Sequence, residues 1–98
     1  HLLAENPDVD GVFACNDLMA LGAIAAIEEA GKTVPDDIAV IGFDDSIPAR
    51  TSRPQLSTVR QDINALGEAA AQLMIAQLNG EPVESRIMPI ELVLRESA

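Results

Sequence analysis

The sequence predicts an α/β fold in which helices cover a parallel sheet. Two short apolar runs, residues 12–15 and 38–43, show no alternation with polar residues, which is typical of strands buried on both faces. Between them, residues 18–30 are rich in Ala and Leu and lead to Gly31, a normal helix exit. Such a βαβ unit is almost always right-handed, so both strands are expected to end at the same edge of the sheet.

The segments on either side of this unit also carry recognisable signals. Residues 2–4 look like the last turn of a helix that ends at Asn6 and Pro7. Because this helix is already under way at His1, we expect the chain to be a fragment of a longer protein. Residues 46–56 contain two Pro and two Arg and are predicted to form an ordered loop.

A short strand over residues 57–60 is predicted to precede a second long helix, residues 63–79. Asp62 can cap this helix and Gly80 ends it. Its apolar residues fall on one face at helical spacing, which favours core packing. They are Ile63, Leu66, Ala70, Leu73, Met74 and Leu78. A final strand follows Pro89, which predicts an edge position or a bend near its start.

Composition and charge limit the classes of function. The 98 residues suffice for one small domain, and with two Phe, no Trp and no Tyr its core must be built from Ala, Leu, Ile and Val. The net charge of −10 opposes binding to nucleic acid or to an anionic membrane, because the six Lys and Arg are scattered. The chain alone is therefore not expected to bind DNA.

Cysteine and histidine content argues against metal and disulfide chemistry. One cysteine, Cys15, excludes an internal disulfide, and with His1 as the single histidine the usual zinc ligand sets cannot form. We expect no metal and no cofactor, and we interpret Cys15 as a small core residue. The longest apolar stretch, residues 18–27, is too short to span a bilayer, so a soluble protein is expected.

Polar side chains follow both predicted buried strands. Asn16 and Asp17 come after the first strand, and Asp44 and Asp45 after the second. Ligands of open parallel α/β sheets bind at this edge, where the strands end. A carboxylate accepts hydrogen bonds in pairs, while an amide both donates and accepts. Asn16 and Asp44 together therefore match a sugar or polyol, and match a phosphate badly.

A simpler explanation of these residues stays open. Asn and Asp after a strand are also ordinary helix caps and turn formers. We assign Asp17 and Asp45 to that role, and expect Asp17 to open the helix, where its charge meets the positive end of the helix dipole.

The helix over residues 18–30 has two apolar faces. The first is formed by Ala20, Ala23, Ile24 and Ile27, and suits packing on the sheet. The second is formed by Leu18, Leu21, Gly22 and Ala25. A helix that covers a sheet needs only the first face, so the second indicates contact with another chain or with a missing part of the protein. Burial of the helix on all sides is the alternative.

Enzymatic chemistry finds little support. The glycines are isolated, so no phosphate-binding loop is present, and Cys15 has no imidazole partner. Carboxylates at strand ends could hold magnesium for phosphoryl transfer in a receiver-type domain. That chemistry also needs a basic residue near the phosphate, and Lys32 lies beyond the far end of the helix. Arg50 and Arg53 could pair with carboxylates, but an exposed pair contributes only about 0 to 1 kcal/mol, so solvated side chains are expected.

Two long runs resemble a known family. They read VFACNDLMALGAIAAIEEAGKTVPDDIAVIGFDD and RPQLSTVRQDINALGEAAAQLM. They resemble the effector-binding domain of LacI/GalR-type bacterial transcriptional regulators, over nearly the whole chain. FACND with IGFDD also fits periplasmic sugar-binding proteins of the same fold, whereas PQLSTVRQ followed by LG and an Ala-rich helix points to the regulators.

The resemblance implies a fragment of a two-lobed, periplasmic-binding-protein-like (type I) fold, with Rossmann-like lobes. Residues 1–60 would be the latter part of the C-terminal lobe of the effector domain. Residues 61–89 would be the crossover and a helix that belongs to the N-terminal lobe, and residues 90–98 the returning strand. The chain would then be roughly the final third of a regulator whose DNA-binding headpiece is absent.

The resemblance also implies roles for particular residues. Asn16 and Asp44 correspond to positions that hydrogen-bond the effector, and Gln61 and Ile63 would line the cleft. The implied dimer interface comprises Leu18, Leu21, Ala25, Ala49, Arg50, Thr51 and Ser52. Cys15 departs from the small Ala or Ser more usual at its position.

The implied partners are a small effector of the sugar or nucleobase class, a second copy of the chain, and operator DNA through the missing headpiece only. The implied protein is a cytoplasmic regulator and not an enzyme, and the alternative is a fragment of a periplasmic sugar-binding transport protein. Because one wall of the cleft supplies few contacts, the isolated chain is expected not to bind sugar. Because the stripe on residues 63–79 would lack its lobe, the isolated chain is expected to self-associate.

Overall fold

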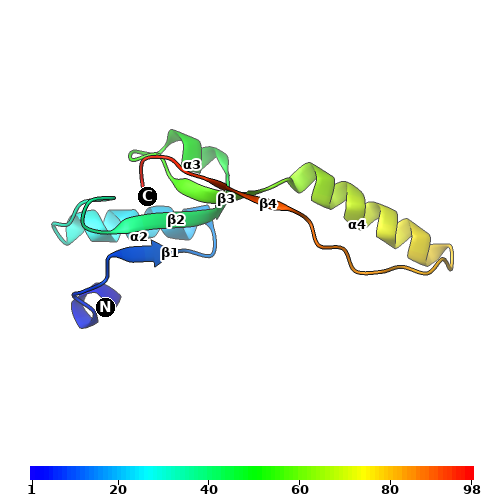
Figure 1. Ribbon diagram of the computed structural model, residues 1–98, viewed down its shortest axis with the longest axis horizontal. Coiled ribbons are helices and arrows are strands. Elements are labelled where there is room, and N and C mark those ends of the chain that lie inside the picture. The colour runs from blue at the N-terminus through cyan, green and yellow to red at the C-terminus, as the bar shows by residue number, and fades with distance from the viewer. The chain divides into compact units, whose positions relative to one another are not determined.

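The computed structural model describes all residues, 1–98, and divides into two compact units. The first unit comprises residues 1–60 and 92–98, and the second comprises residues 61–91. Helices and strands alternate along the chain, beginning with a short helix, α1 (Leu2–Glu5), which confirms the predicted helical turn before Asn6. The four strands form one sheet in the order β1-β2-β3-β4 (Figure 1).

The parallel pairing predicted for the βαβ unit is confirmed. β1 (Gly11–Phe13) pairs in parallel with β2 (Ala39–Asp44), and Phe13 lies opposite Ile41. β2 pairs in parallel with β3 (Ser57–Gln61) on its other side. β4 (Ile90–Val93) completes the sheet beside β3. The predicted sheet fold is therefore present, and the carboxyl ends of β1, β2 and β3 lie at one edge.

α2 (Asp17–Glu29) packs on this sheet through the predicted face. Ala20, Ile24 and Ile27 are buried, at 0%, 4% and 1% exposure, and they join Ile38, Val40 and Leu56 in the core. The other predicted face is largely open: Leu18 is 71% exposed, and Gly22 and Ala25 are exposed, while Leu21 is partly buried against the core. The helix is thus not buried on all sides.

Two expectations for the first unit are wrong. Cys15 is exposed and not a core residue, because β1 ends at Phe13 and the chain has already left the sheet when it reaches Cys15. The segment predicted as a loop contains a one-turn helix, α3 (Ile47–Thr51). Pro48 suits its first turn, where its missing N–H is no loss, and Ala49 is wholly buried in the core beneath it.

The C-terminal residues of the first unit are fixed by backbone and hydroxyl hydrogen bonds. Ser97 is fully buried, and its hydroxyl accepts from the Ser57 N–H at 2.8 Å and donates to the Val40 carbonyl at 2.6 Å. Its own carbonyl accepts from the Val40 N–H at 2.8 Å. Arg95 donates its backbone N–H to the Ser57 hydroxyl at 2.7 Å. This segment therefore ties β2 to β3 from the C-terminal end of the chain.

The second unit consists mainly of α4 (Ile63–Leu78) and the extended segment after it (Figure 1). Asp62 caps α4 as predicted, because its carboxylate accepts from the Ala65 N–H at 2.9 Å. The apolar stripe is not core packing here, since Ala69 is the one buried residue of the helix. Ile63, Met74 and Leu78 are 61%, 57% and 79% exposed. Neither α4 nor any other helix has the length and apolar character needed to cross a membrane.

Candidate functional site at the ends of the strands

The candidate site consists of two dipeptides at the carboxyl ends of neighbouring parallel strands. Asn16 and Asp17 follow β1, and Asp44 and Asp45 end and follow β2. In each pair the first residue is partly exposed and the second is buried, with Asp17 at 2% and Asp45 at 6% exposure. The two halves of each pair therefore have different surroundings and different roles.

Asp17 is held by three donors from two distant segments. One carboxylate oxygen, Oδ2, accepts from the Ser46 N–H and from the Ser46 hydroxyl, both at 2.7 Å. The other, Oδ1, accepts from the Thr58 hydroxyl at 2.6 Å. Gly42 leaves room for this carboxylate, since a Cβ at Gly42 would lie 2.5 Å from Asp17 Oδ1. Asp17 thus opens α2 as expected but does not cap it, and it joins α2 to β3 and to the start of α3.

Asp45 forms ion pairs with three arginines. Its side chain is 1% exposed, and its carboxylate lies 2.7 Å from Arg60 Nε, 2.6 Å from Arg95 Nη2 and 3.0 Å from Arg50 Nη2. Burial raises the pKa of the Asp45 carboxyl, but the hydrogen bonds from Arg60, Arg95 and Arg50 outweigh burial and lower the pKa to about 2. Asp45 therefore does more than form a turn, and Arg50, though its side chain is 56% exposed, pairs with this carboxylate rather than being solvated alone.

Asn16 serves as the N-cap of α2. Its side-chain oxygen accepts from the Met19 N–H at 2.8 Å, which satisfies one of the free N–H groups of the first turn. The amide nitrogen makes no hydrogen bond within the chain. The capping explanation is thus confirmed for the oxygen of Asn16, and the nitrogen is available as a donor.

Asp44 lies where the backbone leaves β2 in an unusual conformation. Its φ is 121° and that of Asp45 is 56°, both in the region that residues other than glycine rarely adopt. Such a conformation costs of order 1–3 kcal/mol and persists only where the surroundings enforce it. The buried carboxylate of Asp45, with its three arginines, supplies that enforcement directly beside Asp44.

The other predicted site residues fall in different places. Gln61 and Ile63 belong to the second unit, so their place in a cleft stays a prediction. Ala49 is wholly buried in the core, so its side chain is not available to a partner, whereas Arg50 and Thr51 are exposed beside it. Ser52 is partly buried, and its hydroxyl donates to the Ala49 and Pro54 carbonyls. The dimer interface itself stays a prediction.

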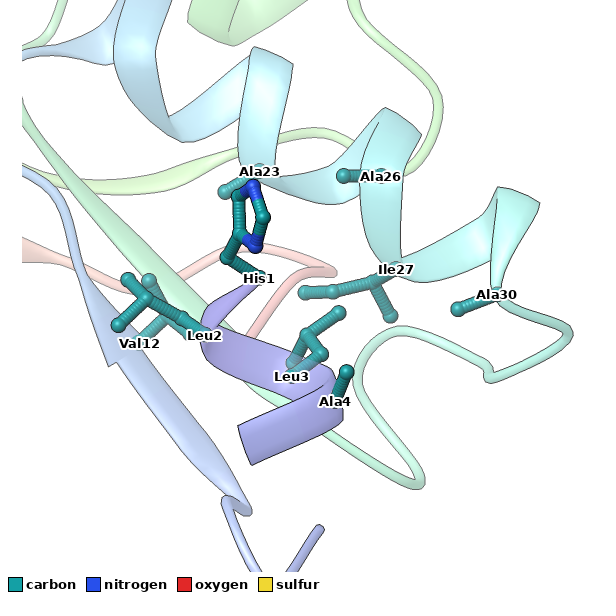
Figure 2. Close-up of a pocket in the computed structure, with 9 residues that line it drawn as sticks. All are labelled: His1, Leu2, Leu3, Ala4, Val12, Ala23, Ala26, Ile27 and Ala30. Atoms are coloured by element: carbon teal, nitrogen blue, oxygen red, sulfur yellow. The ribbon is translucent and has the colours of Figure 1, made fainter. Parts of the chain in front are cut away.

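An apolar cavity of about 590 Å³ lies elsewhere in the first unit, between α1, β1 and α2. Figure 2 shows Leu3 and Ala4 facing Ile27 and Ala30 of α2, with Val12 of β1 at the side. His1 is the one polar side chain of the lining, which gives a sugar almost no hydrogen-bonding partners. This cavity therefore does not compete with the strand ends as a sugar site.

Sequence reasoning missed the anchoring residues of the site. Local sequence patterns indicate only cap and turn roles for Asp17 and Asp45, and no pattern marks Thr58 or Arg95. The one available signal was the doubling of the polar residues, since a cap or a turn needs one such residue and each strand end has two.

No group of three or more His, Cys, Asp or Glu side chains is arranged to hold a metal ion.

Comparison with known proteins decides the family. The periplasmic binding protein-like domain family matches residues 1–98. The transcriptional regulator CelR of Thermobifida fusca is 41% identical over 96% of this chain. A solved CelR–cellobiose complex superposes with a TM-score of 0.92 at 38% identity over 99% of this chain. A lac repressor dimer bound to operator and to the anti-inducer ONPF has a TM-score of 0.89 at 34% identity over 98%.

The chain belongs to the LacI family of transcriptional regulators. It has the periplasmic binding protein-like fold that the sequence predicted, and the resemblance to this family is confirmed. This LacI-family chain spans 26% of the length of the T. fusca regulator, 30% of the CelR chain in the cellobiose complex and 29% of the lac repressor chain.

Proposed function

We propose that this chain is the effector-sensing and dimerising part of a cytoplasmic LacI-type regulator. The effector is a small sugar-like molecule, held between two lobes, and it changes the affinity of a helix-turn-helix headpiece for operator DNA. The chain contributes the latter part of the C-terminal lobe through residues 1–60, and residues 61–89 belong to the other lobe. Residues 90–98 return to the first lobe.

The position of Asn16 and Asp44 at the same edge of the sheet is the observation that carries this proposal. Both residues lie at the edge where β1 and β2 end, which is where ligands bind in parallel sheets. Asn16 offers an amide donor and Asp44 a carboxylate acceptor, the combination that a sugar hydroxyl needs because it donates and accepts at once. The cellobiose bound to the CelR relative agrees with this class of ligand.

The coupling to DNA follows from differential affinity. A sugar that binds one lobe arrangement more tightly shifts a dimer toward that arrangement by about 1 to 3 kcal/mol. A homodimer is supported by the dimeric lac repressor relative and by the apolar residue Leu18, which is 71% exposed. Leu21, Ala25 and the exposed residues of α3 would complete the interface.

Isosteric substitutions separate ligand binding from helix capping. Asn16→Asp keeps the capping oxygen but removes the amide donor, and Asp44→Asn removes the acceptor charge without changing shape. In the regulator that contains this chain, each is expected to weaken cellobiose binding by about tenfold or more. Asn16→Asp loses the donor to a sugar hydroxyl, and Asp44→Asn replaces one of two charged acceptor oxygens by an NH₂ donor. Calorimetry measures the affinity, and a mobility shift on the promoter of its own gene measures the response.

The matched control is Asp36→Asn, an exposed carboxylate outside the site. It should leave the sugar affinity and the DNA response unchanged. If both site variants bind and respond like the wild type, Asn16 and Asp44 are cap and turn residues only. A gene that encodes an export signal in place of a headpiece would identify a transport receptor instead.

A further inference from the structure

One buried hydroxyl group, that of Thr58, connects the two dipeptides of the candidate site. Thr58 of β3 is fully buried, and its Oγ1 donates to Asp17 Oδ1 at 2.6 Å. The same oxygen accepts from the Asp45 N–H at 3.3 Å. Asp17 directly follows Asn16, and Asp45 directly follows Asp44. Thr58 therefore contacts the neighbour of each of the two proposed ligand residues.

We propose that Thr58 is a positioning residue, which sets the placement of Asn16 relative to Asp44 through the buried residues Asp17 and Asp45. This inference rests on the proposed function, because it concerns the same ligand site. Thr58 does not touch the sugar itself. Its hydroxyl holds α2 and the turn after β2 at a fixed spacing, so that the donor and the acceptor stand ready before the sugar arrives.

Preorganisation is the physical basis of this effect. A ligand gains affinity when the groups that bind it need no reordering, because the cost of ordering them has already been met in folding. Asp44 has φ of 121°, which the free backbone does not favour, so its direction depends on a restraint nearby. The Asp45 N–H belongs to the peptide group that directly follows the Asp44 Cα, and it donates a hydrogen bond to the Thr58 hydroxyl at 3.3 Å.

Close packing around the Asp17 carboxylate restricts the positions that this carboxylate can take. Gly42 lies under the Asp17 carboxylate, and any side chain there would meet Asp17 Oδ1 and Leu56 Cδ2. The other oxygen of Asp17 is already bound by the N–H and hydroxyl of Ser46. Loss of the Thr58 hydroxyl would therefore leave a buried carboxylate oxygen without its donor, and the carboxylate would have to move to recover one.

The test compares two substitutions that divide the Thr58 side chain. Thr58→Val keeps its volume and removes the hydroxyl, whereas Thr58→Ser keeps the hydroxyl and removes the methyl. In the regulator that contains this chain, with cellobiose as the probe, Thr58→Val is expected to bind about tenfold more weakly. Thr58→Ser should bind like the wild type, although the lost methyl lowers its melting temperature.

Ser97→Ala provides the control for a general loss of stability. Ser97 is as fully buried as Thr58, but its hydroxyl bonds Ser57 and Val40 and touches neither dipeptide. It should lower the melting temperature and leave the cellobiose affinity within about twofold, because it leaves the binding groups in place. Equal affinity of Thr58→Val and wild type, or equal weakening by Ser97→Ala, would overturn the proposal.

Hydrogen exchange provides a second readout, which needs no ligand. The peptide that contains residues 44–46 carries the Asp45 and Ser46 N–H groups that this network holds. Its exchange, followed by mass spectrometry, should be about tenfold faster in Thr58→Val and unchanged in Thr58→Ser, since exchange follows local opening. Unchanged exchange in Thr58→Val refutes the positioning role. Absence of sugar binding by the wild type, with cellobiose as the first probe, counts against the proposed function alone, because the exchange result still decides the role of Thr58.

Discussion

At the scale of single residues, buried charge organises the candidate site. Asp45 meets three arginines whose exposure differs widely: the side chain of Arg95 is 13% exposed, whereas those of Arg50 and Arg60 are 56% and 44% exposed. Exposed pairs contribute about 0 to 1 kcal/mol, so the pair with Arg95 is expected to contribute most. Arg95 also donates to the Leu56 carbonyl at 2.9 Å, which fixes its guanidinium.

Asp45→Asn tests this charge through the pH dependence of stability. The pKa of Asp45 is lowered to about 2 from its ordinary 3.8, so its ion pairs stabilise the fold fully above about pH 4. That contribution, about 2 kcal/mol, is lost as the pH falls through 2. The variant should therefore lower the free energy of unfolding at pH 7 by about this amount or more, and the gap to the wild type should close between pH 4 and pH 2.

Urea denaturation followed by circular dichroism across this pH range measures the effect. Asp36→Asn removes an exposed carboxylate and should change the free energy of unfolding by less than about 0.5 kcal/mol. A gap between wild type and Asp45→Asn that stays constant down to pH 2 would show that the substitution acts through shape rather than charge.

At the scale of elements, the two long helices differ in how much apolar surface they bury. α2 buries Ala20, Ile24 and Ile27 against the sheet, whereas α4 buries Ala69 alone. Met74, Ile75 and Leu78 of α4 are each more than half exposed. A helix of 16 residues with an exposed apolar stripe normally has a partner surface, since most helical stability comes from packing.

The exposed stripe of α4 predicts self-association of the isolated chain. Sedimentation should show an average mass that rises with concentration, because pairing of two stripes removes apolar area from water. Met74→Glu places a charge in the stripe and should weaken the association by about tenfold. Gln77→Glu adds the same charge at a polar position of α4 and should have little effect. A wild-type chain that is monomeric at every concentration contradicts the prediction.

At the scale of the whole molecule, this chain covers less than a third of two of the relatives compared above. It spans 26% of the T. fusca regulator and 29% of the lac repressor chain. In the proposed function the sugar is held between two lobes, and most of one lobe comes from residues outside this chain. The proposed ligand residues of the first unit, Asn16 and Asp44, therefore supply one wall of a cleft.

The isolated 98-residue chain is accordingly expected not to bind cellobiose measurably. Two hydrogen-bonding residues on one wall cannot offset the loss of translational and rotational freedom on binding, which costs at least about 4 kcal/mol. Calorimetry of the chain at millimolar cellobiose should give heats of dilution only, whereas the proposed function requires that the complete regulator titrates with its sugar. Saturable heat from the isolated chain would mean that its own residues form a sufficient site.

Sequence patterns were sufficient to predict the βαβ unit, the parallel sheet, the buried face of α2 and the edge at which Asn16 and Asp44 lie. Periodicity and turn residues can be recognised within a short stretch of sequence, and the handedness of a βαβ unit follows from a general rule. The roles of Asp17 and Asp45 became visible only in the folded chain, because their partners Ser46, Thr58 and Arg95 lie 29, 41 and 50 residues away. A carboxylate in a sequence does not reveal which distant donors will surround it. Likewise, the five residues of α3 are too few to display a period, so packing of Ala49 into the core decided that helix.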